Sequence, residues 1–148
     1  MTRSEFLARY QDIFEHSPWI VERAYDRGGD FLAACRAVIV EASDEERLSL
    51  IRAHPELAAK IELTAASTAE QMGAGLRALT AGEFEEFAAL NAAYREKFGF
   101  PFVICVREHT KTSILENFRA RLGHDSETEE RTALQEILKI AALRLAAL

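Results

Sequence analysis

The chain has 148 residues, of which 49% are hydrophobic and 28% are charged, and its formal net charge is −6. These values predict one globular domain over residues 1–148, with a core that needs neither a disulfide nor a metal. The negative charge and the scattered basic residues disfavour nucleic acid as a partner. The N-terminus lacks the pattern of a signal peptide, and no apolar run approaches the ~20 residues that span a bilayer. We therefore expect a cytoplasmic protein without a membrane partner.

Apolar residues recur at helical spacing through most of the chain, and residues that favour helix ends separate the runs. The first helix is expected over residues 6–14, before Ser17 and Pro18, which can cap and begin the second. Asp30 can cap a third helix and Ser43 a fourth. A short helix is expected over residues 56–60, and a capping box of Ser67 and Glu70 can begin the next one. A second capping box, of Thr80 and Glu83, can begin a long helix that ends near Gly99. The last two helices are expected over residues 113–122 and after Ser126, which can cap the final one.

The segment over residues 98–106, FGFPFVICV, has the composition of a strand, but no second strand candidate is available to pair with it. We expect a buried extended segment whose backbone polar groups bond to partners elsewhere. The sequence thus predicts an all-α fold, a single compact domain of about eight to nine helices with one buried extended segment.

His54 is the residue whose position most needs explanation. Pro55 disfavours helical backbone geometry at the residue before it and suits the first turn of a new helix. The imidazole is therefore expected at a helix junction, where it can face a cleft. Its ordinary pKa of ~6.5 suits proton transfer at neutral pH, although a lone histidine in a helical protein is more often a capping or partly exposed polar residue.

Two further side chains have a local explanation beside a functional one. Ser67 and Glu70 have the spacing of a capping box, which by itself accounts for the glutamate. Arg144 lies at the edge of an apolar helix face, where it can extend to solvent or make a bidentate contact to a carboxylate or a ureido carbonyl at the rim of a cleft. The four histidines lack the spacing of metal ligands, so no metal site is expected.

Four motifs occur in order along the chain: IRAHPELA, LTAASTAEQMGAGL, FEEFAALNAAYREKFGFPFVICVR and TALQEILKIAALRL. They resemble the motifs of the 2-oxo-4-hydroxy-4-carboxy-5-ureidoimidazoline (OHCU) decarboxylase family over nearly the whole chain. The resemblance implies an all-α carboxy-lyase, commonly a homodimer, that converts this small ureidoimidazoline to (S)-allantoin in the last step of urate degradation, a part of purine catabolism. The substrate has its own electron sink in the ring C=N bond, so no cofactor is expected.

The same resemblance assigns roles to individual residues. His54 matches the catalytic histidine, acting as general acid/base, and Glu70 matches its partner. Glu70 would either orient the imidazole or act on the departing carboxylate. The positions that match substrate contacts are Pro55, Ser67, Gln71, the backbone of Phe102, Val103 and Ile104, and Arg144.

Two other readings of the sequence stay open. One is a non-catalytic all-α ligand-binding or protein-interaction module, in which residues 98–106 form a docking edge and His54 is a helix cap. The other is a related ureide-pathway enzyme with another reaction, such as hydrolysis. Hydrolysis needs an activated water, and the sequence shows neither metal-ligand spacing nor a recognisable Ser or Cys nucleophile beside a histidine.

Overall fold

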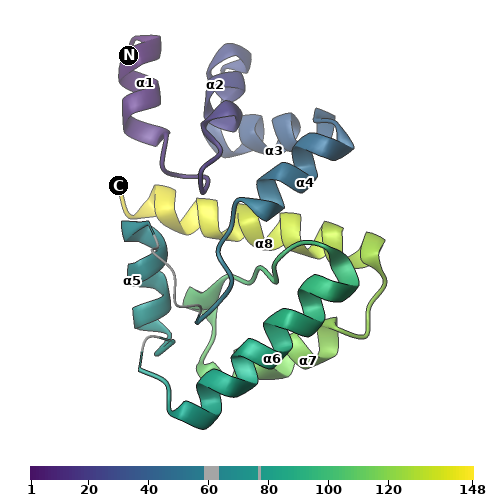
Figure 1. The fold of residues 1–148 in the computed structure, drawn as a ribbon. Coiled ribbons are helices and arrows are strands. Elements are labelled where there is room, and N and C mark those ends of the chain that lie inside the picture. The colour runs from purple at the N-terminus through teal and green to yellow at the C-terminus, as the bar shows by residue number, and fades with distance from the viewer. Residues whose placement is uncertain (59–63, 77) are drawn as a thin grey trace.

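The structure is a computed structural model that describes residues 1–58, 64–76 and 78–148. Within these ranges the chain forms eight α-helices, one short 3-10 helix and no strand, which confirms the all-α prediction. The helices are α1 (Arg3–Tyr10), α2 (Pro18–Arg27), α3 (Phe31–Glu41), α4 (Asp44–Arg52), α5 (Ala65–Gly73), α6 (Ala81–Phe98), α7 (Lys111–Arg121) and α8 (Ser126–Ala146), and the 3-10 helix is η1 (Val106–Glu108) (Figure 1).

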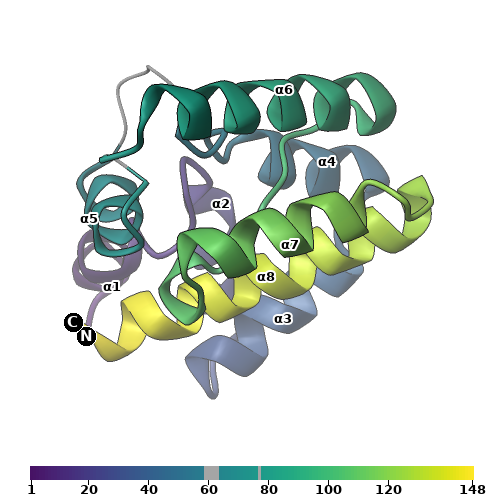
Figure 2. The same ribbon diagram turned by 90° about the horizontal axis from the view of Figure 1, so that it is seen from below.

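Helix α8 runs across the middle of the molecule, with α1 to α4 on one side of it and α5 to α7 on the other (Figures 1 and 2). Ala133, Ile137 and Ile140 recur at helical spacing on its buried face. Arg144 follows Ile140 by four residues and therefore lies on the same inward stripe. In this way the helix period carries a guanidinium to the interior. No helix in the described ranges is both long and apolar enough to cross a membrane.

The extended segment lies between α6 and η1, and most of its residues are buried. The ring of Phe102 stacks on Phe118 of α7 with centroids 3.9 Å apart, and Tyr94 of α6 meets it edge-on at 5.5 Å. Helical side chains supply the backbone partners that a second strand would have given. Arg52 donates to the Gly99 carbonyl at 3.1 Å, Arg121 donates to the Val103 carbonyl at 2.7 Å, and Glu136 accepts from the Cys105 N–H at 3.1 Å.

Several helix limits agree with local sequence rules. Pro18 begins α2, Asp30 caps α3, and the capping box of Ser43 with Glu46 begins α4. A capping box of Thr80 with Glu83 begins α6, and Gly99 ends it in the left-handed region at φ 76°.

The first helix is shorter than predicted. Helix α1 ends at Tyr10, so Ile13 and Phe14 are buried by a turn and not by a helix face. His16 closes this turn with φ 46°. Ser17 does precede α2, but its hydroxyl donates to the Glu15 carbonyl at 3.0 Å and caps nothing. The turn directs Glu15 inward, which matters for the site described below.

Three other limits differ from the prediction. No helix forms over residues 56–58, where Ala58 has φ 58°, and residues 59 and 60 of that predicted helix lie outside the described residues. Helix α7 is capped by Thr110 and α8 by Asp125. In both cases a residue upstream of the predicted start has extended backbone and a side chain that accepts a first-turn N–H.

Candidate active site

His54 lies just beyond the end of α4, where its backbone N–H donates to Ile51 at 3.1 Å. The Leu50 carbonyl, which a continuing helix would pair with that N–H, instead lies 2.9 Å from the His54 ring nitrogen Nδ1. A carbonyl can only accept, so Nδ1 carries the proton and the other ring nitrogen, Nε2, keeps its lone pair. The junction created by Pro55 thus selects one tautomer of the imidazole.

The His54 side chain is buried and held neutral. Burial lowers its pKa to about 4, against the opposing effects of the Leu50 hydrogen bond and the carboxylates of Glu15 and Glu70, while the nearby charge of Arg144 lowers it further. A neutral imidazole with a free lone pair is a ready proton acceptor at neutral pH.

Glu70 is not a capping residue. A capping box would make Ser67 the N-cap of helix α5, but the helix begins earlier. Its N-cap is Thr64, which has extended backbone and whose hydroxyl accepts the Ser67 N–H at 3.2 Å. Ser67 is therefore the third residue of the helix, and the predicted capping box is wrong. The Glu70 carboxylate is free for a long-range partner, and Arg144 donates to it from Nε at 3.0 Å and from Nη2 at 2.9 Å.

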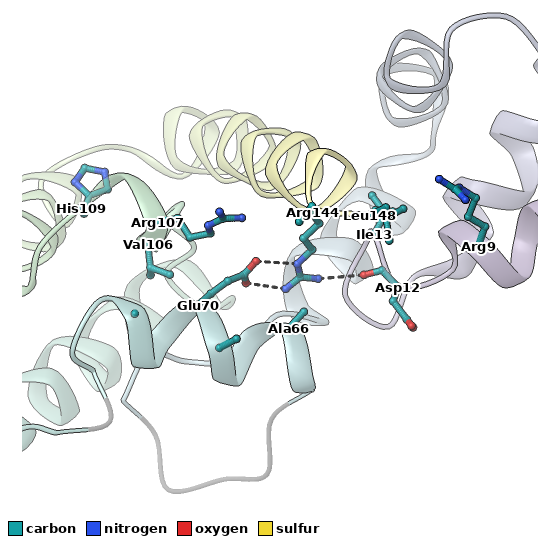
Figure 3. A pocket seen from close by; sticks show the side chains of 13 residues that line it. Arg9, Asp12, Ile13, Ala66, Glu70, Val106, Arg107, His109, Arg144 and Leu148 are labelled. Atoms are coloured by element: carbon teal, nitrogen blue, oxygen red, sulfur yellow. Dashed lines mark hydrogen bonds and ion pairs between the residues drawn. The ribbon is translucent and has the colours of Figure 1, made fainter.

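Arg144 does not extend to solvent, since only 8% of it is exposed. Besides the bidentate pair with Glu70, its guanidinium lies 3.3 Å from each of three other acceptors: the Asp12 carbonyl, a Glu15 carboxylate oxygen and the Ser67 hydroxyl. Figure 3 shows the pair with Glu70 and the bond to Asp12. The bidentate contact expected at the rim of a cleft is made, in this structure, to a carboxylate of the protein itself.

A narrow cavity of about 30 Å³ joins all nine residues named from the sequence, although they come from four separate parts of the chain. Its volume has room for about two water molecules. The nine residues, which are part of a larger lining, are His54, Pro55, Ser67, Glu70, Gln71, Phe102, Val103, Ile104 and Arg144.

A second, wider cavity of about 550 Å³ lies outside the first, and Glu70 and Arg144 line both. Their ion pair therefore lies between the two spaces. Arg107, His109 and Arg9 also line the wider cavity, and Figure 3 shows Arg107 beside the ion pair. The volume is in the range of small-molecule sites.

Three residues of the extended segment, Phe102, Val103 and Ile104, line the narrow cavity. The N–H groups of Val103 and Ile104 donate to no residue in the described ranges. These two N–H groups are therefore unused donors on a segment that buried aromatic rings hold in place. Among the residues that the structure describes, no cluster of His, Cys, Asp and Glu could hold a metal ion.

Comparison with known proteins decides the family. A sequence model of OHCU decarboxylase matches residues 1–146. An OHCU decarboxylase of Haloferax volcanii is 42% identical over 146 residues, which cover 95% of this chain and 87% of that protein. The chain belongs to the OHCU decarboxylase family. The enzyme class expected from the sequence, a carboxy-lyase of this family, is confirmed.

Solved structures agree with this assignment. A crystal structure of (S)-allantoin synthase superposes with a TM-score of 0.79 at 30% identity, over 99% of this chain and 50% of that chain. Our chain thus spans half the length of that crystallised protein. An OHCU decarboxylase crystallised in the presence of (S)-allantoin superposes with a TM-score of 0.76 at 23% identity, over 93% of this chain and 94% of that one, and shows the shared fold.

Two polar residues near the site of this OHCU decarboxylase family member were missed by the sequence analysis. Glu15 is 3% exposed and accepts hydrogen bonds from the hydroxyls of Ser67 and Thr64. Asn91 of α6 donates to the Leu57 carbonyl at 2.9 Å, and its side-chain oxygen Oδ1 is buried with no hydrogen-bond partner in the part of the chain that the structure describes.

Proposed function

We propose that this protein decarboxylates OHCU to (S)-allantoin without a cofactor, as the last step of urate degradation to allantoin. The observation that carries the proposal is the narrow cavity, which is lined by a neutral buried imidazole, a carboxylate, a guanidinium and residues of the extended segment. Membership of the OHCU decarboxylase family supports the choice of substrate.

The proposed reaction needs a base and an electron sink. When CO2 leaves, its bonding electrons pass into the neighbouring C=N bond of the ring. His54 takes the proton of the ring hydroxyl at Nε2, the nitrogen that the Leu50 contact leaves unprotonated. An enol-like intermediate results. The ring nitrogen that received the electrons takes a proton from solvent, and His54 returns the hydroxyl proton to the ring carbon from one face. This gives (S)-allantoin, and no external electron acceptor takes part.

The geometry favours one of the two roles considered for Glu70. The Leu50 carbonyl already orients the His54 ring, whereas Glu70 bonds to Arg144. We therefore assign Glu70 to the substrate carboxylate, which a negative charge in a buried site destabilises until it leaves as neutral CO2. A role through charge predicts that Glu70→Gln loses most of the activity, whereas an orienting glutamate would tolerate this change.

Arg144 and Gln71 are proposed to hold the ureido and ring carbonyls. The Gln71 side-chain oxygen accepts the Ala58 N–H at 3.1 Å, which leaves its NH2 group to donate to a ligand. Ser67, Pro55 and the backbone of residues 102–104 complete the proposed contacts.

A cavity of about 30 Å³ is too small for the substrate, so binding requires the cavity to open. The Glu70–Arg144 pair separates it from the wider cavity, and an anionic substrate carries a carboxylate that can compete with Glu70 for the guanidinium. We propose that the substrate enters through the wider cavity, where Arg9 and Arg107 attract an anion to a protein of negative net charge.

We also propose a cytoplasmic homodimer, which the family resemblance supports. The acidic composition disfavours nucleic acid as a further partner. Analytical ultracentrifugation tests the dimer, and a single species at 16.6 kDa over the micromolar range would contradict it.

The test generates the unstable substrate from urate with urate oxidase and 5-hydroxyisourate hydrolase, and then adds this protein while circular dichroism is recorded. We expect rapid appearance of optically active (S)-allantoin. Slow formation of racemic product in the presence of folded protein would contradict the proposal and favour the non-catalytic helical module.

The matched variant is His54→Gln, which keeps a polar side chain but removes the base. We expect kcat to fall on the order of 10²-fold or more, with a smaller change in KM. His124→Gln is the control, because His124 is half-exposed, contacts Glu129 and does not line either cavity near His54. Equal losses in both variants would contradict the role of His54.

A further inference from the structure

Glu15 holds a position that the mechanism above does not use. It lies in the turn between α1 and α2, 129 residues before Arg144 and 52 before Ser67 in the sequence, and is buried against both. Burial by itself would raise its pKa, but the hydrogen bonds from Ser67 and Thr64 and the charge of Arg144 lower it below its ordinary value. Glu15 is thus an ionised carboxylate beside the narrow cavity.

The guanidinium of Arg144 has two differently bonded edges. The edge formed by Nε and Nη2 faces Glu70, while Nη1 faces the Glu15 carboxylate and the Asp12 carbonyl, each at 3.3 Å. Glu70 lines both cavities, whereas Glu15 does not line either of them. A ligand that enters between the cavities can therefore displace Glu70 and leave the Glu15 contact intact.

Glu15 also sets the direction of the Ser67 hydroxyl. That hydroxyl donates its only proton to Glu15, so the oxygen is left to accept from Nη2 of Arg144 at 3.3 Å. The Thr64 hydroxyl donates to the same carboxylate at 2.9 Å and ties it to the start of α5. One carboxylate thus links the α1–α2 turn, α5 and α8 at the cavity wall.

We propose that Glu15 is a positioning residue that keeps the Arg144 guanidinium and the Ser67 hydroxyl in their binding geometry when an anionic substrate displaces Glu70. This inference rests on the proposed function. The physical reason is that an arginine released from Glu70 would otherwise lose its main counter-ion and could turn towards the wider cavity. A second, buried carboxylate on the opposite edge holds it in place.

The interaction between Glu15 and Arg144 is tested without any activity measurement, by a double-mutant cycle in which unfolding in urea is measured. We expect Glu15→Gln to lower the folding equilibrium constant about tenfold in the wild-type background, and to have little effect when Arg144→Gln is already present. Equal effects in the two backgrounds would overturn the proposal, because Glu15 would then not act through Arg144.

The effect of Glu15 on substrate binding is tested by measuring KM and kcat separately in the coupled assay. We expect Glu15→Gln to raise KM about tenfold with a much smaller change in kcat, and to change neither further in an Arg144→Gln background. Glu15→Asp keeps the charge and should recover part of the lost affinity, and it serves as the second variant if Glu15→Gln does not fold. Glu46→Gln is the matched control, because Glu46 pairs with Arg23 on the surface and should leave both constants unchanged.

The outcomes separate the two proposals. An inactive wild-type protein contradicts the proposed function, and the unfolding cycle still decides whether Glu15 acts through Arg144. An active wild-type protein with an unchanged KM in both Glu15 variants, or with a KM effect that persists without Arg144, overturns the positioning role alone.

Discussion

Two buried clusters of arginine and glutamate lie near the extended segment. In one, Arg144 meets Glu70 and Glu15 beside His54. In the other, Arg121 donates to Glu129 at 2.8 Å, and Tyr94 donates to the same glutamate at 2.6 Å. Both clusters contain arginine and glutamate, but Arg144 and Glu70 line two cavities, whereas Arg121 lies 4.3 Å from the centre of the Phe102 ring.

The comparison separates a binding arrangement from a structural one. Arg121 donates to the Val103 carbonyl and so holds the segment, and Val103 and Ile104 line the narrow cavity. The Arg121 cluster thus helps to position a segment that lines the same narrow cavity as Arg144 and Glu70. Burial of an ion pair does not by itself reveal a function, and the adjoining cavity is what distinguishes the two clusters.

The largest expected effect concerns stability and contrasts the two arginines. Arg121→Met leaves the fully buried Glu129 without its cation, and we expect a loss of about 3–5 kcal/mol in the free energy of unfolding. Arg144→Met should cost less, because Glu70 can turn towards the wider cavity and Glu15 keeps its two hydroxyl donors. Urea denaturation followed by circular dichroism measures both, and an equal or reversed order would contradict the contrast.

The next effect is an acid sensitivity that arises at His54. The unfolded chain binds a proton there near pH 6.5, whereas the folded protein does so only at about pH 4. The contribution is therefore fully present above pH 6.5 and is lost as the pH falls towards 4, by up to about 3 kcal/mol. Unfolding free energies at pH 7.5 and 5 check this prediction, because about 2 kcal/mol of the loss falls within this interval. The loss over this interval should shrink in His54→Gln, and an unchanged loss would assign it to other groups.

A smaller effect tests the hydrogen bonding of the structural cluster. Tyr94→Phe removes the hydroxyl that donates to Glu129 and changes little else in a site packed by aromatic rings. We expect a loss of about 1.5–3 kcal/mol, the usual range for a hydrogen bond to a charged group. Phe98→Leu tests packing in the same cluster without a change in hydrogen bonding. A neutral result for Tyr94→Phe would show that Arg121 and His124 satisfy Glu129 by themselves.

The smallest effect concerns the turn that directs Glu15 inward. His16 is exposed and has φ 46°, a conformation that glycine adopts without steric cost. We expect His16→Gly to raise the free energy of unfolding by up to about 1 kcal/mol, because the relief of strain exceeds the added entropy of the unfolded chain. Thermal unfolding measures the change. A lower melting temperature would mean that the His16 side chain has a stabilising contact.

Local rules predicted those parts of the fold that depend on neighbours in the sequence. The capping boxes at Ser43 and Thr80 were predicted, as was the break before Pro55. At Ser67 the same rules failed because Thr64, three residues earlier, satisfies them too. When two hydroxyl residues lie one helical turn apart, only packing decides which of them begins the helix.

The motifs of the OHCU decarboxylase family brought nine residues to attention, and the fold places all nine around one cavity. Glu15 was missed because its partners are 49 to 129 residues away in the sequence. No periodicity or spacing indicates such a contact. Its burial beside Arg144 depends on how α8 passes between the α1–α2 turn and α5 (Figure 1).

The sequence by itself therefore determined the helical class, the extended segment, the junction at His54 and the family, because these follow from the backbone preferences and order of neighbouring residues. Only the tertiary structure decided which nitrogen of His54 keeps its lone pair and which acids meet Arg144. The physical reason is that tautomer, pKa and ion pairing depend on burial and on partners from distant segments, and those are defined only once the helices have packed.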